Sequence, residues 1–208
     1  MKRWSNVLVF LFGLNFMAMG IALYLKTNIG VSSWDALYYN FYDFYGLTVG
    51  TWVFILGIII ILISQLVYFK PIHFFAIITG LIQGWLIDLW FERIYVFTLT
   101  NLPLRYLLFI VSLFILGNGI ALVILSKLPP TTGDVFMVSL QKRFKLNQFA
   151  SKTLADFIAL VVTVIITFIN HKPFNYIGIG TILSLSLIGS IVQIATNYWK
   201  KILSFLDK

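Results

Sequence analysis

The chain has 208 residues, of which 60% are hydrophobic, 17% aromatic and only 11% charged. A soluble domain usually carries about 25% charged residues, so this composition excludes a water-soluble monomer. At about 20 apolar residues for each membrane crossing, the length accommodates roughly five to seven spanning helices and no separate soluble domain. Cysteine is absent, which excludes disulfides, thiolate metal sites and cysteine nucleophiles.

Six apolar runs are long enough to cross a membrane as helices. They cover residues 7–25, 51–69, 72–91, 104–125, 150–170 and 176–198. The first run follows Lys2 and Arg3, as the apolar part of a signal peptide would, but no convincing cleavage site precedes Lys26. We interpret it as a retained helix, and the sequence predicts an all-α membrane protein with six transmembrane helices.

The basic residues predict the orientation of these helices. With the N-terminus in the cytoplasm, eleven of the 15 Lys and Arg residues fall on the cytoplasmic side and four on the other. Because cytoplasmic loops are enriched in Lys and Arg, we expect a plasma membrane protein with both termini in the cytoplasm. The net charge of +8 then indicates anionic lipid headgroups at the cytoplasmic face of the bilayer, and not nucleic acid, as its partner.

A short pattern recurs in the second half of the chain. Gly20-Ile-Ala-Leu23 returns 99 residues later as Gly119-Ile-Ala-Leu122. The same offset continues through a polar loop, where three pairs of polar residues match: Ser32 and Thr131, Ser33 and Thr132, and Asp35 and Asp134. Each half, residues 1–100 and 101–208, therefore reads as a span, a polar loop, a short helix and two further spans. Because three spans are an odd number, this pattern predicts two inverted three-helix repeats within one membrane domain.

Two segments resemble motifs of a known family. Gly30-Val-Ser-Ser-Trp-Asp35, followed by an amphipathic stretch and Gly46-Leu-Thr-Val-Gly50, resembles the Gly-x-x-Pro-Trp-Asp segment of the YczE/YyaS/YitT-like bacterial membrane proteins. Gly178-Ile-Gly-Thr181 is similar to the Gly-x-Gly-Thr motif of that family. Ser33 stands where the family often has Pro. The resemblance implies a multi-pass bacterial plasma membrane protein of poorly defined activity.

The two polar loops contain the first candidate site. In each loop a hydroxyl precedes a carboxylate by three residues at the predicted start of a short helix: Ser32 with Asp35, and Thr131 with Asp134. In one interpretation both pairs are capping boxes that satisfy free amides. In the other, the N-termini of short helices in inverted halves hold an ion or small solute near the middle of the membrane.

The third span contains a second candidate site. Asp88 and Glu92 are four residues apart on one helical face, where they can share a proton or a cation. Alternatively, they form a surface cluster with Arg93 near the end of the span. Gln193 matches Asp88 at an offset of 105, which retains a polar residue in the second half without its charge.

Other polar and small residues in the spans have structural explanations. Lys152 precedes Asp156 by one helical turn and predicts a salt bridge. Asn15, Gln65, Asn118 and Gln193 predict hydrogen bonds between helices. The small residues of Ala18-Met-Gly-Ile-Ala22 and Gly80-Leu-Ile-Gln-Gly84 predict close helix packing.

No enzyme signature is present, since the chain contains no HExxH motif, nucleophile elbow or phosphate-binding loop. We therefore expect neither catalysis nor a cofactor or metal. The favoured hypothesis is a small secondary transporter or channel-like permease for an unknown small solute or ion, with its site between the inverted repeats, near Asp35, Asp88 and Asp134.

Two other functions remain open. The first is a membrane accessory or scaffold protein whose basic segment Lys142-Arg143-Phe-Lys145 binds anionic lipid or a cytoplasmic protein partner, or a protein that forms a homo-oligomer. The second is the substrate-capture subunit of a vitamin importer, which has a similar size and number of spans.

Overall fold

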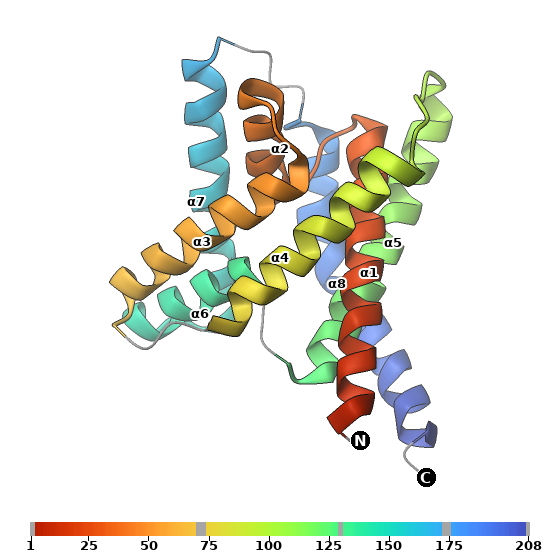
Figure 1. Ribbon diagram of the computed structural model, residues 1–208, viewed down its shortest axis with the longest axis vertical. Helices are drawn as coiled ribbons and strands as arrows, with labels where there is room; N and C mark the ends of the chain where they lie inside the picture. Colours follow the sequence, from red (N-terminus) through yellow and green to blue (C-terminus); the bar gives the residue numbers. More distant parts are fainter. Residues whose placement is uncertain (1–2, 70–73, 129–130, 172–175, 207–208) are drawn as a thin grey trace. The chain divides into compact units, whose positions relative to one another are not determined.

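The computed structural model describes residues 3–69, 74–128, 131–171 and 176–206, and these residues form helices and short connections without a β-strand (Figure 1). The elements are α1 (Arg3–Thr27), α2 (Ser33–Tyr45), α3 (Val49–Val67), α4 (Phe74–Asp88), the π-helical turn η1 (Leu89–Ile94), α5 (Leu102–Ser126), α6 (Thr132–Phe144), α7 (Gln148–Ile169) and α8 (Ile179–Leu206).

Six of these helices can cross a membrane by length and composition. Their apolar segments are Ser5–Thr27, Val49–Val67, Phe75–Ile94, Leu102–Ser126, Ala150–Ile169 and Ile179–Ser204. They coincide with the six predicted runs, which confirms the all-helical fold and the number of candidate spans. Helices α2 and α6 have 13 residues each, and both follow the first span of their half of the sequence, as predicted.

Local signals explain where several of these helices begin and end. The side chains of Ser32, Thr48, Asn101 and Asn147 each accept a hydrogen bond from an amide in the first turn of the helix that follows. At the end of α2, Gly46 adopts a φ of 74°, a conformation that costs glycine little, and its amide donates to the carbonyl of Tyr42 over 3.1 Å.

The helices group into two compact units. Unit 1 consists of Met1–Val31, Leu86–Leu128 and Gly178–Lys208, and unit 2 of Ser32–Trp85 and Pro129–Ile177. Each unit contains helices from both halves of the sequence, so the contacts of this fold join segments about 100 residues apart.

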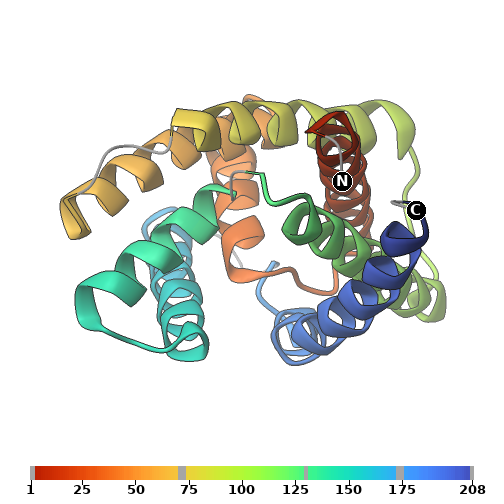
Figure 2. The ribbon, with the colours of Figure 1, turned by 90° about the horizontal axis from the view of Figure 1, so that it is seen from below.

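In unit 1, α5 packs against α1 and α8, and η1 packs against α1 (Figures 1 and 2). At three glycines, an added Cβ would lie within 3.0 Å of the facing helix: Gly13 at Val123 (2.8 Å), Gly119 at Met17 (2.4 Å) and Gly20 at Leu116 (2.7 Å). The residue numbers rise along α1 while they fall along α5, so the two helices are antiparallel. Ala18 and Ala22 are fully buried, which confirms the predicted close packing of α1.

Hydrogen bonds between helices also stabilise unit 1. The indole of Trp90 donates to the side-chain oxygen of Asn15 over 3.0 Å, and that of Trp199 donates to Asn118 over 2.8 Å. These contacts confirm the predicted role of both asparagines. The guanidinium of Arg105 donates to the carbonyls of Thr27 and Asn28 at the end of α1, where a cation is favourable.

The two motifs that resemble the known family contact each other in unit 1. The amide of Gly180 donates to the carbonyl of Ile29 over 3.1 Å. Gly30 has a φ of 130°, and a Cβ on it would lie 2.9 Å from the amide nitrogen of Thr181. Both the conformation and the close approach of the backbones therefore require glycine at this position.

In unit 2, α2 contacts α3 and α7, and α6 likewise contacts α3 and α7 (Figure 2). A buried cluster of Ile61, Ala76 and Val135 joins α3, α4 and α6. The amide of Asn40, which is 2% exposed, donates to the hydroxyl of Thr167 over 2.7 Å and so connects α2 to α7.

Candidate functional site

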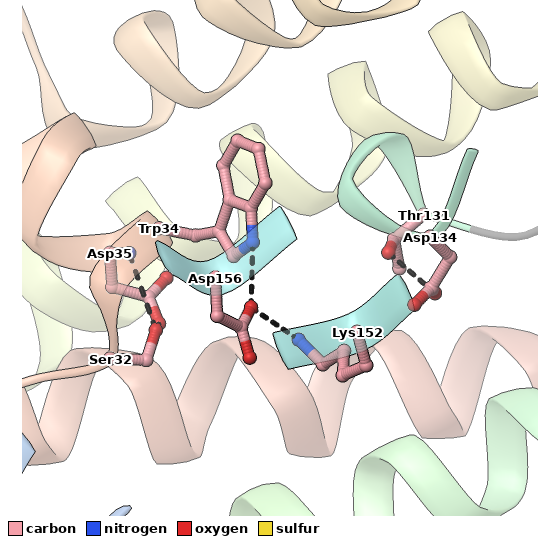
Figure 3. Close-up of polar contacts among 7 residues, drawn as sticks. All are labelled: Ser32, Trp34, Asp35, Thr131, Asp134, Lys152 and Asp156. Atoms are coloured by element: carbon pink, nitrogen blue, oxygen red, sulfur yellow. Dashed lines mark hydrogen bonds and ion pairs between the residues drawn. The ribbon is translucent and has the colours of Figure 1, made fainter. Parts of the chain in front are cut away.

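The two predicted hydroxyl–carboxylate pairs lie at the N-termini of α2 and α6 in unit 2 (Figure 3). The Ser32 hydroxyl donates to Oδ2 of Asp35, and the Thr131 hydroxyl donates to Oδ2 of Asp134 over 2.7 Å. The structure thus places the same hydroxyl–carboxylate contact at both short helices.

The two pairs differ in how they cap their helices. At α2, the backbone amide of Asp35 donates to the Ser32 hydroxyl over 3.3 Å, so this serine is an N-cap as predicted. At α6, Thr131 occupies the N-cap position but its side chain accepts no amide. Capping therefore explains the pair at α2 and leaves the hydroxyl–carboxylate contact at α6 without that explanation.

Trp34 joins the first turns of the two short helices. Its ring packs edge-on against Phe136 of α6, with ring centroids 6.0 Å apart. On the same helix, a Cβ added to Gly133 would lie 3.8 Å from the indole. The candidates Asp35 and Asp134 consequently belong to one polar region of unit 2, which we call the short-helix site.

Tyr38 belongs to the short-helix site as well. Burial raises the pKa of its phenol, the negative charges of Asp35 and Asp134 raise it further, and a hydrogen bond with Thr132 acts in the opposite direction. The phenol therefore stays protonated and lies within electrostatic range of both carboxylates. Neither Tyr38 nor Thr132 was identified as a site residue from the sequence, although Thr132 matches Ser33 at the repeat offset.

A third carboxylate reaches the short-helix site from α7. Asp156 accepts a hydrogen bond from the Trp34 indole over 3.0 Å and forms the predicted salt bridge with Lys152 over 2.7 Å (Figure 3). Burial raises the pKa of Asp35, the positive charge of Lys152 lowers it, and the negative charge of Asp156 raises it. The site thus combines three carboxylates with one ammonium group.

Two buried polar side chains of unit 2 have no hydrogen-bond partner among the residues that the structure describes. These are the hydroxyl of Ser33, which is 1% exposed, and both amide atoms of Gln83, which is 6% exposed. One turn before Gln83 on the same face of α4, a Cβ added to Gly80 would lie 3.3 Å from the Thr132 methyl group. Because an unsatisfied buried polar group is costly, these atoms are suited to bind water or a polar ligand.

The second candidate site lies in unit 1. Asp88 ends α4, and Glu92, whose side chain is exposed, lies in the wider turn η1 that follows. The ammonium of Lys26 lies 4.0 Å from the centroid of the Phe91 ring in this turn. Gln193 is exposed on α8, which packs on α5, whereas η1 packs on α1. The structure therefore gathers Ser32, Asp35, Thr131 and Asp134 in unit 2 and leaves Asp88, Glu92 and Gln193 in unit 1.

The chemistry of the short-helix site is that of proton or cation binding. Carboxylates paired with hydroxyls and with a protonated phenol can exchange a proton or surround a small cation. Within the described ranges, no group of three or more His, Asp or Glu side chains is placed to hold a metal ion.

The chain belongs to a family of unknown function, DUF6198, which matches residues 3–197. It is 28% identical over 186 residues to the uncharacterized protein YyaS of Bacillus subtilis (strain 168), covering 88% of each chain. It is 24% identical over 192 residues to the uncharacterized membrane protein YczE of the same organism, covering 92% of this chain and 84% of YczE. No solved structure matches the chain. These relatives confirm the YczE/YyaS resemblance and support a multi-pass membrane protein.

Proposed function

We propose that this member of the DUF6198 family is a small secondary transporter that moves a cation or proton, together with or in exchange for a small solute, through the short-helix site. The observation that carries the proposal is the matching of the two hydroxyl–carboxylate pairs, Ser32 with Asp35 and Thr131 with Asp134, in one unit. Breaks followed by short helices at equivalent places in two halves are typical of transporter binding sites.

The proposed architecture is a pair of inverted repeats, residues 1–100 and 101–208. It is supported by helix contacts that map onto one another when α1 to α4 are exchanged with α5 to α8. The contact of α2 with α7 becomes that of α6 with α3, and the contact of α2 with α3 becomes that of α6 with α7. The antiparallel packing of α1 and α5 agrees with inversion of the second copy.

Individual contacts support the same architecture. The close approaches of Gly20 to Leu116 and of Gly119 to Met17 exchange with each other at the offset of 99 residues. In both halves, a tryptophan of the third span also donates to an asparagine of the first. In such repeats, rocking of one element against another gives alternating access to a shared site.

The proposed location is the plasma membrane with both termini in the cytoplasm. The first turn of α1 and the last turn of α8 lie toward the same end of unit 1, in agreement with an even number of spans (Figure 1). Exposed Lys142, Arg143 and Lys145 at the end of α6 would then contact anionic headgroups at the cytoplasmic face.

The transport proposal is tested by ion flux in proteoliposomes that contain the full chain and the pH dye pyranine. With an imposed Na⁺ or K⁺ gradient, we expect a proton flux well above that of protein-free liposomes. Asp35→Asn and Asp134→Asn should each reduce this flux at least tenfold. Asn is also a good N-terminal helix residue, so neither variant should lose more than about 1 kcal/mol of stability.

Asp43→Asn is the matched control, because Asp43 is an exposed carboxylate on the same helix as Asp35. Its flux should equal that of the wild type. A flux no greater than that of protein-free liposomes, or an unchanged flux in both site variants, would refute the proposed ion pathway.

A further inference from the structure

Unit 2 contains an apolar cavity next to the short-helix site, open on the side where the lining residues Ile59, Ile63 and Val162 are exposed. Its volume is about 170 Å³, and it is lined by side chains from α2, α3, α6 and α7. Three aromatic rings, those of Trp34, Phe41 and Phe136, form part of the wall, and the remaining lining residues are aliphatic. The cavity is therefore suited to an apolar group.

The walls of the cavity come from matching positions of the two halves. Leu37 and Phe136 are 99 residues apart and both line it. Two further lining pairs, Leu56 with Ile158 and Ile60 with Val162, are 102 residues apart. The cavity thus lies between the α2–α3 pair and the α6–α7 pair, which is where a transporter of two repeats binds its substrate.

The volume limits what the cavity can hold. In another protein, an engineered cavity of about 150 Å³ with Leu, Ile and Phe walls stays dry and binds benzene. A cavity of about 170 Å³ accordingly accepts an apolar group the size of a single aromatic ring.

Negative charge lies beside the aromatic wall. Trp34 lines the cavity while its indole nitrogen donates to Asp156, which is paired with Lys152. Asp35 lies within electrostatic range of both of these side chains. Asp134 is in the first turn of α6, two residues before the lining residue Phe136. Three carboxylates against one ammonium group favour a cation at this end, and aromatic faces add to the attraction.

From this arrangement we infer that unit 2 binds a small organic cation, with a ring-sized apolar group in the cavity and its positive charge beside Trp34 and the carboxylates. The inference rests on the proposed transport function and names its substrate class. An amine with a single aromatic ring has the required size, apolar body and charge.

The test is binding to the purified full-length protein in nanodiscs, measured by equilibrium dialysis against empty nanodiscs. Benzyltrimethylammonium is the cationic probe, and benzyl alcohol is the neutral probe of similar shape. We expect saturable binding of one cation per chain, at least tenfold tighter than binding of the alcohol. Trp34→Leu and Val162→Phe, which remove an aromatic wall and fill the cavity, should each weaken binding at least tenfold.

Trp85→Leu is the control variant, because Trp85 is 64% exposed in the same unit and does not line the cavity. Its affinity should match that of the wild type. Equal binding of both probes, or full affinity in both cavity variants, would overturn the inference. Cation binding without ion flux would refute transport and leave the binding site, whereas ion flux without cation binding would refute this substrate class alone.

Discussion

The indole of Trp34 packs against Gly133, the residue that occupies the position of Trp34 in the second half of the chain, 99 residues later. A Cβ on Gly133 would lie 3.8 Å from the indole ring, an ordinary contact distance, so only a methyl-sized space separates the tryptophan from the backbone of α6. The two halves therefore place a large residue against a glycine at equivalent positions. With this asymmetry, one aromatic ring joins the N-termini of α2 and α6.

Close packing of α1 on α5 predicts a large effect of adding a methyl group at Gly119. The new Cβ would lie 2.4 Å from the backbone nitrogen of Met17, so the helices must separate. We expect Gly119→Ala to destabilise the protein by about 1–3 kcal/mol, the usual cost of overpacking. Thermal unfolding in detergent measures the change.

The control for this experiment is Gly189→Ala in α8, because an added Cβ at this position meets nothing within 4 Å. It should be neutral or stabilising by up to about 1 kcal/mol, since alanine favours a helix over glycine. Equal effects at both glycines would contradict the close approach of α1 and α5.

The buried hydrogen bond between Asn40 and Thr167 predicts energetic coupling of α2 and α7. Asn40→Ala removes the amide donor, and Thr167→Val removes the hydroxyl acceptor. Each variant should lower the free energy of unfolding by about 1–3 kcal/mol, because the remaining partner is buried without this hydrogen bond. The double variant should cost less than the sum of the two single variants, with a coupling of about 0.5–3 kcal/mol. Chemical or thermal unfolding of the four proteins measures this cycle, and strict additivity would exclude the contact.

The raised pKa of Asp35 predicts a specific dependence of stability on pH. The folded protein keeps the proton of this carboxyl at pH values at which the unfolded chain, with an aspartate pKa of about 3.9, has lost it. The folded state then binds more protons, so the contribution of Asp35 to stability is complete below about pH 4 and decreases as the pH rises through the raised pKa. Asp35→Asn removes this decrease.

This pH effect is measured as the difference in Tm between Asp35→Asn and the wild type in detergent, from about pH 4 to pH 8. The Tm of Asp35→Asn should increase relative to the Tm of the wild type as the pH rises. Asp43→Asn, on the exposed face of the same helix, is the matched control for the loss of a carboxylate. A constant difference for Asp35→Asn over this pH range would mean that burial does not perturb this carboxyl.

The proposed orientation predicts that the ends of α2 and α6 lie on opposite sides of the membrane. Since the natural chain has no cysteine, single cysteines at the exposed positions Asp43 and Lys145 can be labelled selectively. An impermeant maleimide added to intact cells should label the first and not the second, and permeabilisation should make Lys145→Cys reactive. A third cysteine at Asn101, between the third and fourth spans, should behave like the one at Asp43. Labelling of Asp43→Cys and Lys145→Cys from the same side would remove the inverted arrangement.

Several features of the protein follow from local sequence alone. The six spans were predictable because about 20 consecutive apolar residues satisfy a bilayer regardless of their neighbours. The N-cap of α2 at Ser32 and the salt bridge of Lys152 with Asp156 were predictable because both depend on spacings of three or four residues along one helix. The offset of 99 residues is also visible in the sequence, and it pairs Asp35 with Asp134 without any knowledge of the tertiary structure.

Tertiary structure decided which of the candidate residues meet. The indole of Trp34 donates to Asp156, which is 122 residues away in the sequence. Gln83 is buried without a hydrogen-bond partner in the described part of the chain. No local sequence pattern predicts either the contact of Trp34 or the burial of Gln83. It also assigned Asp35 and Asp134 to one unit and Asp88 and Gln193 to the other. The physical reason is that all six candidate spans are apolar, so hydrophobicity alone does not choose their neighbours. Helix pairing in a membrane depends on the fit of small residues and on individual hydrogen bonds between distant segments.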